Sequence, residues 1–121
     1  MTTATGHTQA ICARKAIGTN VYDRAGDKLG KIEDIVLDKL SNNIMFAVLG
    51  SGGVMGMGEK YRPSPWSELD YDTDKGGYVV SFTKDQLREA PADSLEALTK
   101  DDGLAYRDRA FKHYGTEQYW H

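Results

Sequence analysis

The glycine-rich segment from Gly50 to Gly58 is the part of the sequence closest to a site for chemistry. Glycine-rich loops cradle phosphates when they join a strand to the N-terminus of a helix. Here no Lys-Ser or Lys-Thr pair follows, and the next segment carries two prolines, which favours an extended chain. We therefore interpret the segment as a turn that needs glycine. Val54, Met55 and Met57 alternate with these glycines, and apolar side chains on a loop suit an adaptable contact with another protein.

The acidic residues and the histidines do not predict a metal or catalytic site. Glu33 and Asp34 are neighbours, so on a regular strand their side chains point to opposite faces, and lysines surround them and Asp38. A hard cation instead needs several oxygen ligands at one point. The three histidines lack the spacing of a transition-metal motif, and no Ser, Cys or His pattern indicates a nucleophile with its base. We expect no enzyme activity, no metal and no cofactor.

Three aromatic residues near the C-terminus form a second candidate contact. Tyr114, Tyr119 and Trp120 are of the types that most often anchor protein interfaces. They could instead fold back over an open end of their own chain, or pack on a second copy. We rank packing on their own chain slightly ahead of docking.

Length and composition set the class of protein. The 121 residues are 40% hydrophobic and 27% charged, which suits one globular domain with a modest core. The net charge of −3 disfavours a nucleic-acid binder. Arg107, Arg109 and Lys112 form a mildly basic face whose attraction to an anionic membrane would be weak. The single Cys12 excludes an internal disulfide, and we interpret it as a half-buried apolar residue.

The sequence predicts no membrane anchor. No apolar run is long enough to span a bilayer, and the polar N-terminus lacks the pattern of a signal peptide. We therefore expect a cytoplasmic protein.

Residues 17–82 predict short strands separated by turns. Strict alternation fails between Ile32 and Ile35, which predicts a bulge or strong coiling of the strand. The prolines on either side of Ser64 indicate an edge strand or an extended crossing. The other expected strands are 19–23, 29–38, 44–51, and the hairpin pair 69–72 and 78–82.

The pattern becomes helical after residue 82. The capping box at 83–86 predicts a short helix that ends before Pro91. A second start signal follows at 93–96, and residues 101–103 break the helix there. Leu104 to Tyr114 predicts a longer amphipathic helix with Gly115 as its C-cap. Short strands followed by helices favour a small barrel or sandwich that the helices cap.

Four ordered segments resemble the PRC-barrel family: IGTNVY at 17–22, GDKLGKIED at 26–34, GGVMGMGEKY at 52–61 and PWSEL at 65–69. This chain has Ser64 where the family often carries an apolar residue before the Pro-Trp pair. The fold is shared with the cytoplasmic domain of the photosynthetic reaction-centre H subunit and the C-terminal domain of the ribosome maturation factor RimM. The resemblance implies a mainly β fold, a small barrel of about six strands.

We expect three parts: a flexible leader over 1–14, the barrel over 15–91, and a helical extension with the aromatic tail over 92–121. The residues expected to serve the fold are Gly26, Gly30, Gly53, Gly58, Pro65 and Trp66.

The family resemblance implies docking and supplies no family-wide catalytic residues. We expect a non-enzymatic protein-binding or assembly module that self-associates as a dimer or larger oligomer, with a partner that the sequence does not name. One alternative is a binding domain linked to RNA or ribosome assembly. Another is a small-molecule-binding protein or a photosynthesis-related accessory protein.

Overall fold

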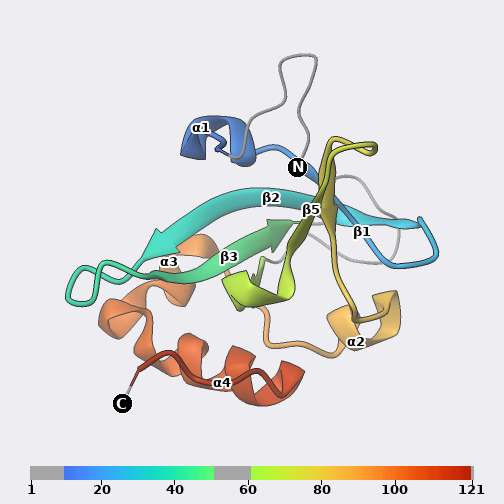
Figure 1. Cartoon of the computed structure of the whole chain (residues 1–121). Coiled ribbons are helices and arrows are strands. Elements are labelled where there is room, and N and C mark those ends of the chain that lie inside the picture. The colour runs from blue at the N-terminus through green and yellow to red at the C-terminus, as the bar shows by residue number, and fades with distance from the viewer. Residues whose placement is uncertain (1–9, 51–60, 121) are drawn as a thin grey trace.

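A six-stranded mixed sheet is the centre of the fold (Figure 1). The computed structural model describes residues 10–50 and 61–120 of the chain. In space the strands follow the order β4-β3-β2-β1-β6-β5, and the end strands β4 and β5 do not pair with each other. The strands are β1 Asn20–Tyr22, β2 Lys28–Leu37, β3 Ile44–Gly50, β4 Arg62–Ser64, β5 Asp70–Asp72 and β6 Gly77–Val79.

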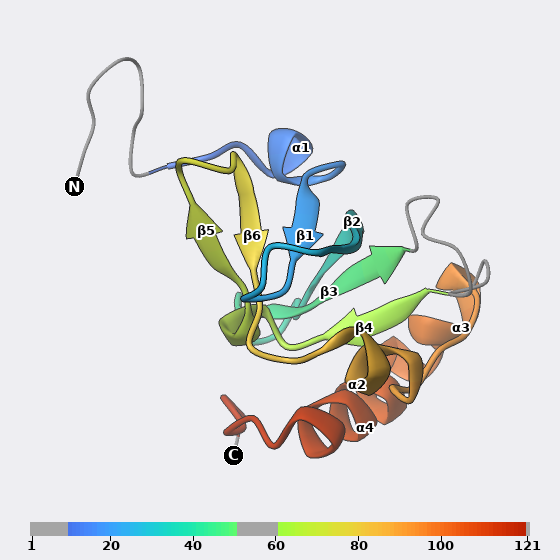
Figure 2. The ribbon, with the colours of Figure 1, turned by 90° about the vertical axis from the view of Figure 1, so that its right-hand side faces the viewer.

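The sheet curls into an open barrel. Figure 2 shows β5, β6 and β1 on one side and β2, β3 and β4 on the other. The neighbouring strands are antiparallel except β1 and β6, which run parallel. The register of β2 against β3 shifts between Ile32 and Asp34, which confirms the predicted bulge. A bulge bends its strand and increases its twist. The prediction of a mainly β fold of about six strands with a helical extension is confirmed, although the sheet is not closed.

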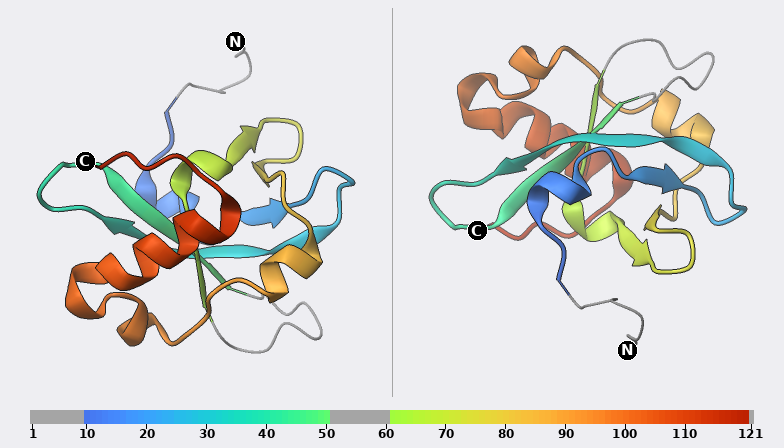
Figure 3. Two further views of the ribbon diagram at one scale, coloured as in Figure 1. Left: turned by 90° about the horizontal axis from the view of Figure 1, so that it is seen from below. Right: turned by 90° about the horizontal axis from the view of Figure 1, so that it is seen from above.

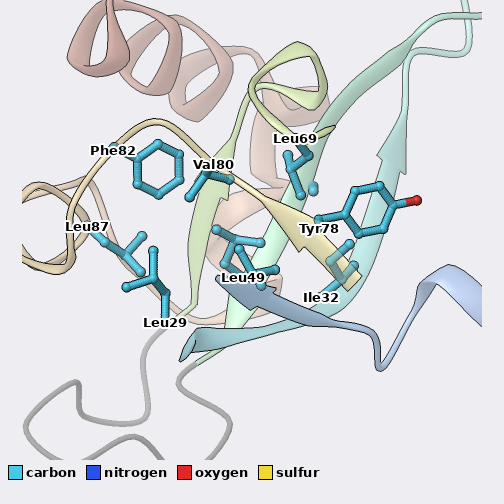
Figure 4. Packing of buried hydrophobic residues seen from close by; sticks show 10 residues of the cluster. Leu29, Ile32, Leu49, Leu69, Tyr78, Val80, Phe82 and Leu87 are labelled. Atoms are coloured by element: carbon cyan, nitrogen blue, oxygen red, sulfur yellow. The ribbon is translucent and has the colours of Figure 1, made fainter. Parts of the chain in front are cut away.

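A first hydrophobic cluster fills the space inside the curled sheet (Figure 4). Leu29 and Ile32 of β2 are fully buried there against Leu49 of β3. Each fully buried side chain of this size contributes roughly 1.5–3 kcal/mol relative to an exposed one. The cluster consists of Val21, Leu29, Ile32, Ala47, Leu49, Leu69, Tyr78, Val80, Phe82 and Leu87.

A second cluster lies on the opposite face of β3. Met45, Phe46 and Val48 pack there against Leu98 from the C-terminal helices. Strand β3 is therefore buried on both faces, which explains why its sequence is a continuous apolar run. In the left view of Figure 3, the long helix α4 (Leu104–Tyr114) crosses the sheet on this side.

The helices begin where the sequence predicts. In α2 (Lys84–Arg88), the Gln86 N–H donates to the Thr83 hydroxyl at 3.2 Å and the Thr83 N–H donates to the Gln86 side chain at 2.8 Å, so the capping box is confirmed. Ser94 caps α3 (Leu95–Leu98) by accepting a hydrogen bond from the Ala97 N–H at 3.2 Å. These caps satisfy backbone donors that the helix itself leaves unpaired.

A tight reversal separates α3 from α4. In the 3₁₀ turn η2 (Lys100–Gly103), Asp101, Asp102 and Gly103 all adopt positive φ angles. The φ of +76° at Gly103 favours glycine, and the residue lies close to β3, since a Cβ atom there would be 2.9 Å from the Met45 sulfur. The predicted break at 101–103 is thus confirmed, and it brings α4 close to β3.

The edge of the sheet and the N-terminal segment complete the fold. Strand β4 is an edge strand, as its prolines predict. Ser64 is fully buried there, and its hydroxyl donates to the Pro65 carbonyl at 3.3 Å. The short helix α1 is Ala13–Ala16. Cys12, just before it, is exposed, so the expectation that this thiol is half-buried is wrong.

Among the described residues, no helix has both the length and the hydrophobicity needed to cross a bilayer.

Replacing Leu98 with alanine should lower the free energy of unfolding by roughly 2–5 kcal/mol, because the side chain is fully buried between α3 and β3. Urea unfolding followed by far-UV circular dichroism measures the change. The matched control is Ile11→Ala, whose side chain is 43% exposed and whose loss should cost under about 0.5 kcal/mol. Equal costs at the two positions would contradict the second cluster.

Candidate functional site

The expected contact residues of the glycine-rich loop lie outside the described part of the chain. This applies to Val54, Met55 and Met57, and also to Gly53 and Gly58.

Tyr114 is anchored inside its own chain. Its ring packs on Phe82 with the ring centroids 4.4 Å apart, next to the first cluster. Burial raises the pKa of the Tyr114 hydroxyl, which has no hydrogen-bond partner among the described residues. A side chain in this position stabilises the barrel rather than presenting itself to a partner.

The tail after α4 folds back over the helix. Trp120 packs on Phe111 with the ring centroids 4.8 Å apart, and the Arg107 guanidinium lies 3.6 Å from the Trp120 ring centroid. Tyr119 also contacts Phe111, with a centroid distance of 5.9 Å. The structure therefore places both aromatic residues against their own chain.

The reversal at the end of α4 is a Schellman motif. Gly115 has a φ of +65°, and its N–H donates to the Lys112 carbonyl at 3.2 Å. The Thr116 N–H donates to the Phe111 carbonyl at 2.9 Å, which is the bond that defines the motif. The Thr116 hydroxyl then donates to the Glu68 carboxylate at 2.9 Å and fixes the direction of the tail.

Asp38 organises the turn between β2 and β3 and connects it to the tail. One carboxylate oxygen accepts the Leu40 N–H at 3.0 Å and the Ser41 N–H at 3.3 Å. The other accepts the Tyr119 hydroxyl at 2.8 Å. One side chain thus holds both the turn and the C-terminal tail.

These hydrogen bonds change two pKa values in opposite directions. The hydrogen bond from Tyr119, together with the backbone N–H of Leu40, lowers the pKa of Asp38 because both stabilise the carboxylate. Burial and the bond to Asp38 raise the pKa of Tyr119 to about 12. The contact is therefore strongest where Asp38 is ionised and Tyr119 is neutral.

The turn carries an exposed apolar surface, which we call the hairpin surface and define as Leu37, Leu40 and Leu104. Their side chains are 64%, 97% and 44% exposed, respectively. The three border a groove of about 400 Å³ whose lining also includes Val36 and Met45. Contiguous exposed apolar surface of this kind marks interaction sites more often than scattered single residues do.

Charges of opposite sign flank the hairpin surface. Lys39 lies beside Leu40 in the turn, and Asp102 lines the groove from the side of η2. Both residues are exposed, and neither forms a salt bridge within residues 10–50 and 61–120.

Sequence reasoning did not identify the hairpin surface. It treated residues 39–43 as an ordinary turn. The available signal was a leucine, Leu40, in the middle of a turn that is otherwise polar, directly after the apolar end of β2. The hydrogen bonds of a turn do not need a leucine side chain. An apolar residue at this position therefore indicates a contact beyond the turn.

Four of the six residues expected to serve the fold are described, and they lie in the sheet and its turns. Gly26 has a φ of +92° in the β1–β2 turn, and Gly30 is buried in β2 opposite Val21. Pro65 precedes the 3₁₀ turn η1 (Trp66–Glu68). The half-buried Trp66 ring packs edge-on against Tyr78 with a centroid distance of 5.6 Å.

The acidic residues of β2 do not converge. Glu33 is 3.9 Å from the ammonium group of Lys31, and the Asp34 carboxylate accepts the N–H of Ile35 at 2.8 Å. In the part of the chain that the structure describes, no three His, Cys, Asp or Glu side chains come together as metal ligands.

Comparison with known families identifies a matching family. A family model described as the PRC-barrel domain matches residues 10–87. The matched region begins before α1 and ends inside α2, so α3, α4 and the tail follow it. A comparison with curated proteins finds no match.

Replacing Tyr119 with phenylalanine should flatten the dependence of stability on pH at both extremes. The lowered pKa of Asp38 adds stability above its unfolded value of about 4, and this is lost as the pH falls through the folded value. The raised pKa of Tyr119 adds stability below about pH 10 that is lost as the pH rises towards 12. Urea midpoints measured across this range test the expectation.

Tyr71→Phe is the matched control, because Tyr71 is 47% exposed and lies away from the tail. On the acid side, where the ionisation of Asp38 is tested, its pH profile should follow the wild type. Identical profiles for Tyr119→Phe and the wild type would show that the hydrogen bond between Tyr119 and Asp38 does not contribute to stability.

Proposed function

The chain belongs to the PRC-barrel family, and from that premise we propose that it is a non-enzymatic assembly module that pairs with a second copy of itself through the hairpin surface. The observation that supports this most directly is Leu40, an apolar side chain that is 97% exposed in a turn held by several hydrogen bonds.

The rigidity of the turn favours binding. Asp38 accepts two backbone N–H groups of the turn and the Tyr119 hydroxyl. The Asp38 N–H also donates to the Asn43 carbonyl at 2.8 Å, and the Asn42 N–H donates to the Asp38 carbonyl at 2.9 Å. A side chain presented by an ordered backbone loses less conformational entropy on association than one on a free loop. Leu40 is therefore well placed to act as an anchor.

The hairpin surface is complementary to itself. The anchor Leu40 and the apolar groove lined by Leu37, Met45 and Leu104 lie side by side on one face. In a two-fold dimer each copy offers both elements, so the leucine of one copy can enter the groove of the other and the reverse. This geometry favours a second copy over an unrelated partner.

The flanking charges also match a second copy. Lys39 accompanies the anchor, and Asp102 lines the groove that would receive it. When Leu40 enters the partner's groove, Lys39 is brought towards the partner's Asp102. Such pairs at the rim of an interface contribute mainly to the orientation of binding and to its rate.

The proposal that the module is non-enzymatic rests on the nature of the site. The groove is lined chiefly by apolar side chains. Its polar lining is Asp38, Lys39, Thr99 and Asp102, of which Asp38 is engaged by Tyr119 and the turn. Acid–base or nucleophilic catalysis needs a reactive group with a positioned partner beside an accessible hollow. The aliphatic lining instead suits the burial of another apolar surface.

Replacing Leu40 with aspartate should convert the dimer to a monomer, because it places a charge at the centre of the contact. Sedimentation equilibrium across a dilution series measures the dissociation constant, which we expect to rise by at least about tenfold. Ile11→Asp is the matched control, since Ile11 is 43% exposed in a different part of the chain. A wild-type chain that stays monomeric at all concentrations would overturn the proposal.

The charge pair can be tested by a double-mutant cycle. Lys39→Gln and Asp102→Asn should each weaken the dimer. The double variant should lower the free energy of dissociation by less than the sum of the two single changes. Asparagine is chosen because residue 102 has a φ of +58°, which asparagine tolerates. If the two changes in dissociation free energy, calculated from the measured dissociation constants, were strictly additive, Lys39 and Asp102 would not interact. That result would exclude this arrangement of the two copies.

A further inference from the structure

A groove on another side of the molecule is lined mainly by cationic side chains. It has a volume of about 730 Å³ and lies between α2, the segment 88–92, β4 and α4. Figure 2 shows α2 next to α4 with β4 beside them. We call it the basic groove and define it as Arg62, Arg88, Arg109, Lys112 and His113, with Glu89 as the acidic residue of its lining.

Three separate elements contribute these side chains. Arg109, Lys112 and His113 are spaced at i, i+3 and i+4, so they share one face of α4. Arg62 comes from the edge strand β4 and is only 8% exposed. Arg88 is the last residue of α2. The convergence of residues this far apart in sequence is a property of the fold, which sequence reasoning could not detect.

A hydrogen bond holds the two helices that form the groove. His113 Nε2 lies 2.9 Å from the Gln86 carbonyl oxygen. A carbonyl oxygen only accepts hydrogen bonds, so Nε2 carries the hydrogen and donates it. The bond connects α4 to α2 and keeps the cationic side chains of the two helices together.

The charge of the groove contrasts with that of the chain. Four of the defining side chains are permanently cationic, and one carboxylate accompanies them, whereas the whole chain has a net charge of −3. Arg88 is 3.6 Å from Asp85, a carboxylate that is 88% exposed, and the Arg109 guanidinium lies 4.7 Å from the Tyr106 ring centroid. The ion pair with Asp85 offsets part of the charge of Arg88, whereas the aromatic contact leaves the charge of Arg109 in place. Clustered cations of this kind attract an anion.

We propose that the basic groove binds a phosphoryl group. Arginine presents a planar fork of donors that matches phosphate oxygens two at a time, and three arginines line the groove together with Lys112. A single phosphoryl or pyrophosphoryl unit fits better than a long polyanion, because the carboxylates of Asp85 and Glu89 adjoin the cations. This inference does not depend on self-association.

Titration with inorganic pyrophosphate, in a chloride buffer and followed by ¹H–¹⁵N NMR, tests the proposal. We expect saturable shifts confined to residues 88–92 and 109–113. The variant Arg109→Ala/Lys112→Ala should bind at least about tenfold more weakly, because it removes two charge-assisted contacts. Both side chains are exposed, so the variant should fold normally. Arg24→Ala/Lys28→Ala is the control with the same change of charge at exposed positions of the β1–β2 hairpin, and it should bind like the wild type.

Further arms of the experiment identify the source of the phosphoryl group. Co-sedimentation with phosphatidylcholine vesicles that contain phosphatidic acid, lost in Arg109→Ala/Lys112→Ala, would assign it to a lipid headgroup. Pyrophosphate binding without co-sedimentation would assign it to a soluble compound. Three outcomes overturn the proposal: no saturation up to about 10 mM, equal weakening by the two double variants, or binding of single-stranded RNA through these residues without pyrophosphate binding.

Discussion

The burial of β3 on both faces is the constraint on which the rest of the structure depends. One face contributes Ala47 and Leu49 to the interior of the curled sheet. The other face contributes Phe46 and Val48, which would meet water if only the sheet were present. Exposing two such side chains would cost roughly 3–6 kcal/mol, a large part of the stability of a small domain. The C-terminal helices are therefore part of the folding unit, even though the family match ends at residue 87.

A second constraint follows from how α4 is placed. The left-handed residues 101–103 turn the chain sharply after α3, and Gly103 allows close contact with Met45. At the other end, the Schellman motif at Gly115 returns the tail along α4 to Asp38. The helix is thus fixed at both ends by short turns, and each turn connects it to the β2–β3 hairpin. This explains how a hairpin tip that projects from the sheet can still be held rigidly.

Local signals in the sequence predict most of the helices and strands. The features that they do not predict depend on contacts between residues far apart in the sequence. The capping box at Thr83, the helix end at Gly115 and the prolines of β4 act within a few residues, so the sequence alone identifies them. The openness of the sheet depends instead on whether β4 and β5 pair, which no local pattern encodes. The candidate sites divide in the same way. The aromatic tail can be recognised from its residue types alone. The basic groove cannot, because it depends on Arg62 and Lys112, fifty residues apart in sequence, lining the same groove.

Both candidate surfaces involve the helical extension, and this bears on where the function of the chain resides. The hairpin surface uses Leu104, and the groove beside it includes Asp102. The basic groove takes Arg109, Lys112 and His113 from the other end of α4. The barrel contributes Leu40 from the β2–β3 turn to the first groove and Arg62 from the edge strand β4 to the second. A helix that must cover β3 therefore also creates two hollows along its borders, one aliphatic and one cationic. The residues of the extension that border these two hollows lie beyond residue 87, where the family match ends, so the matched region alone forms neither hollow.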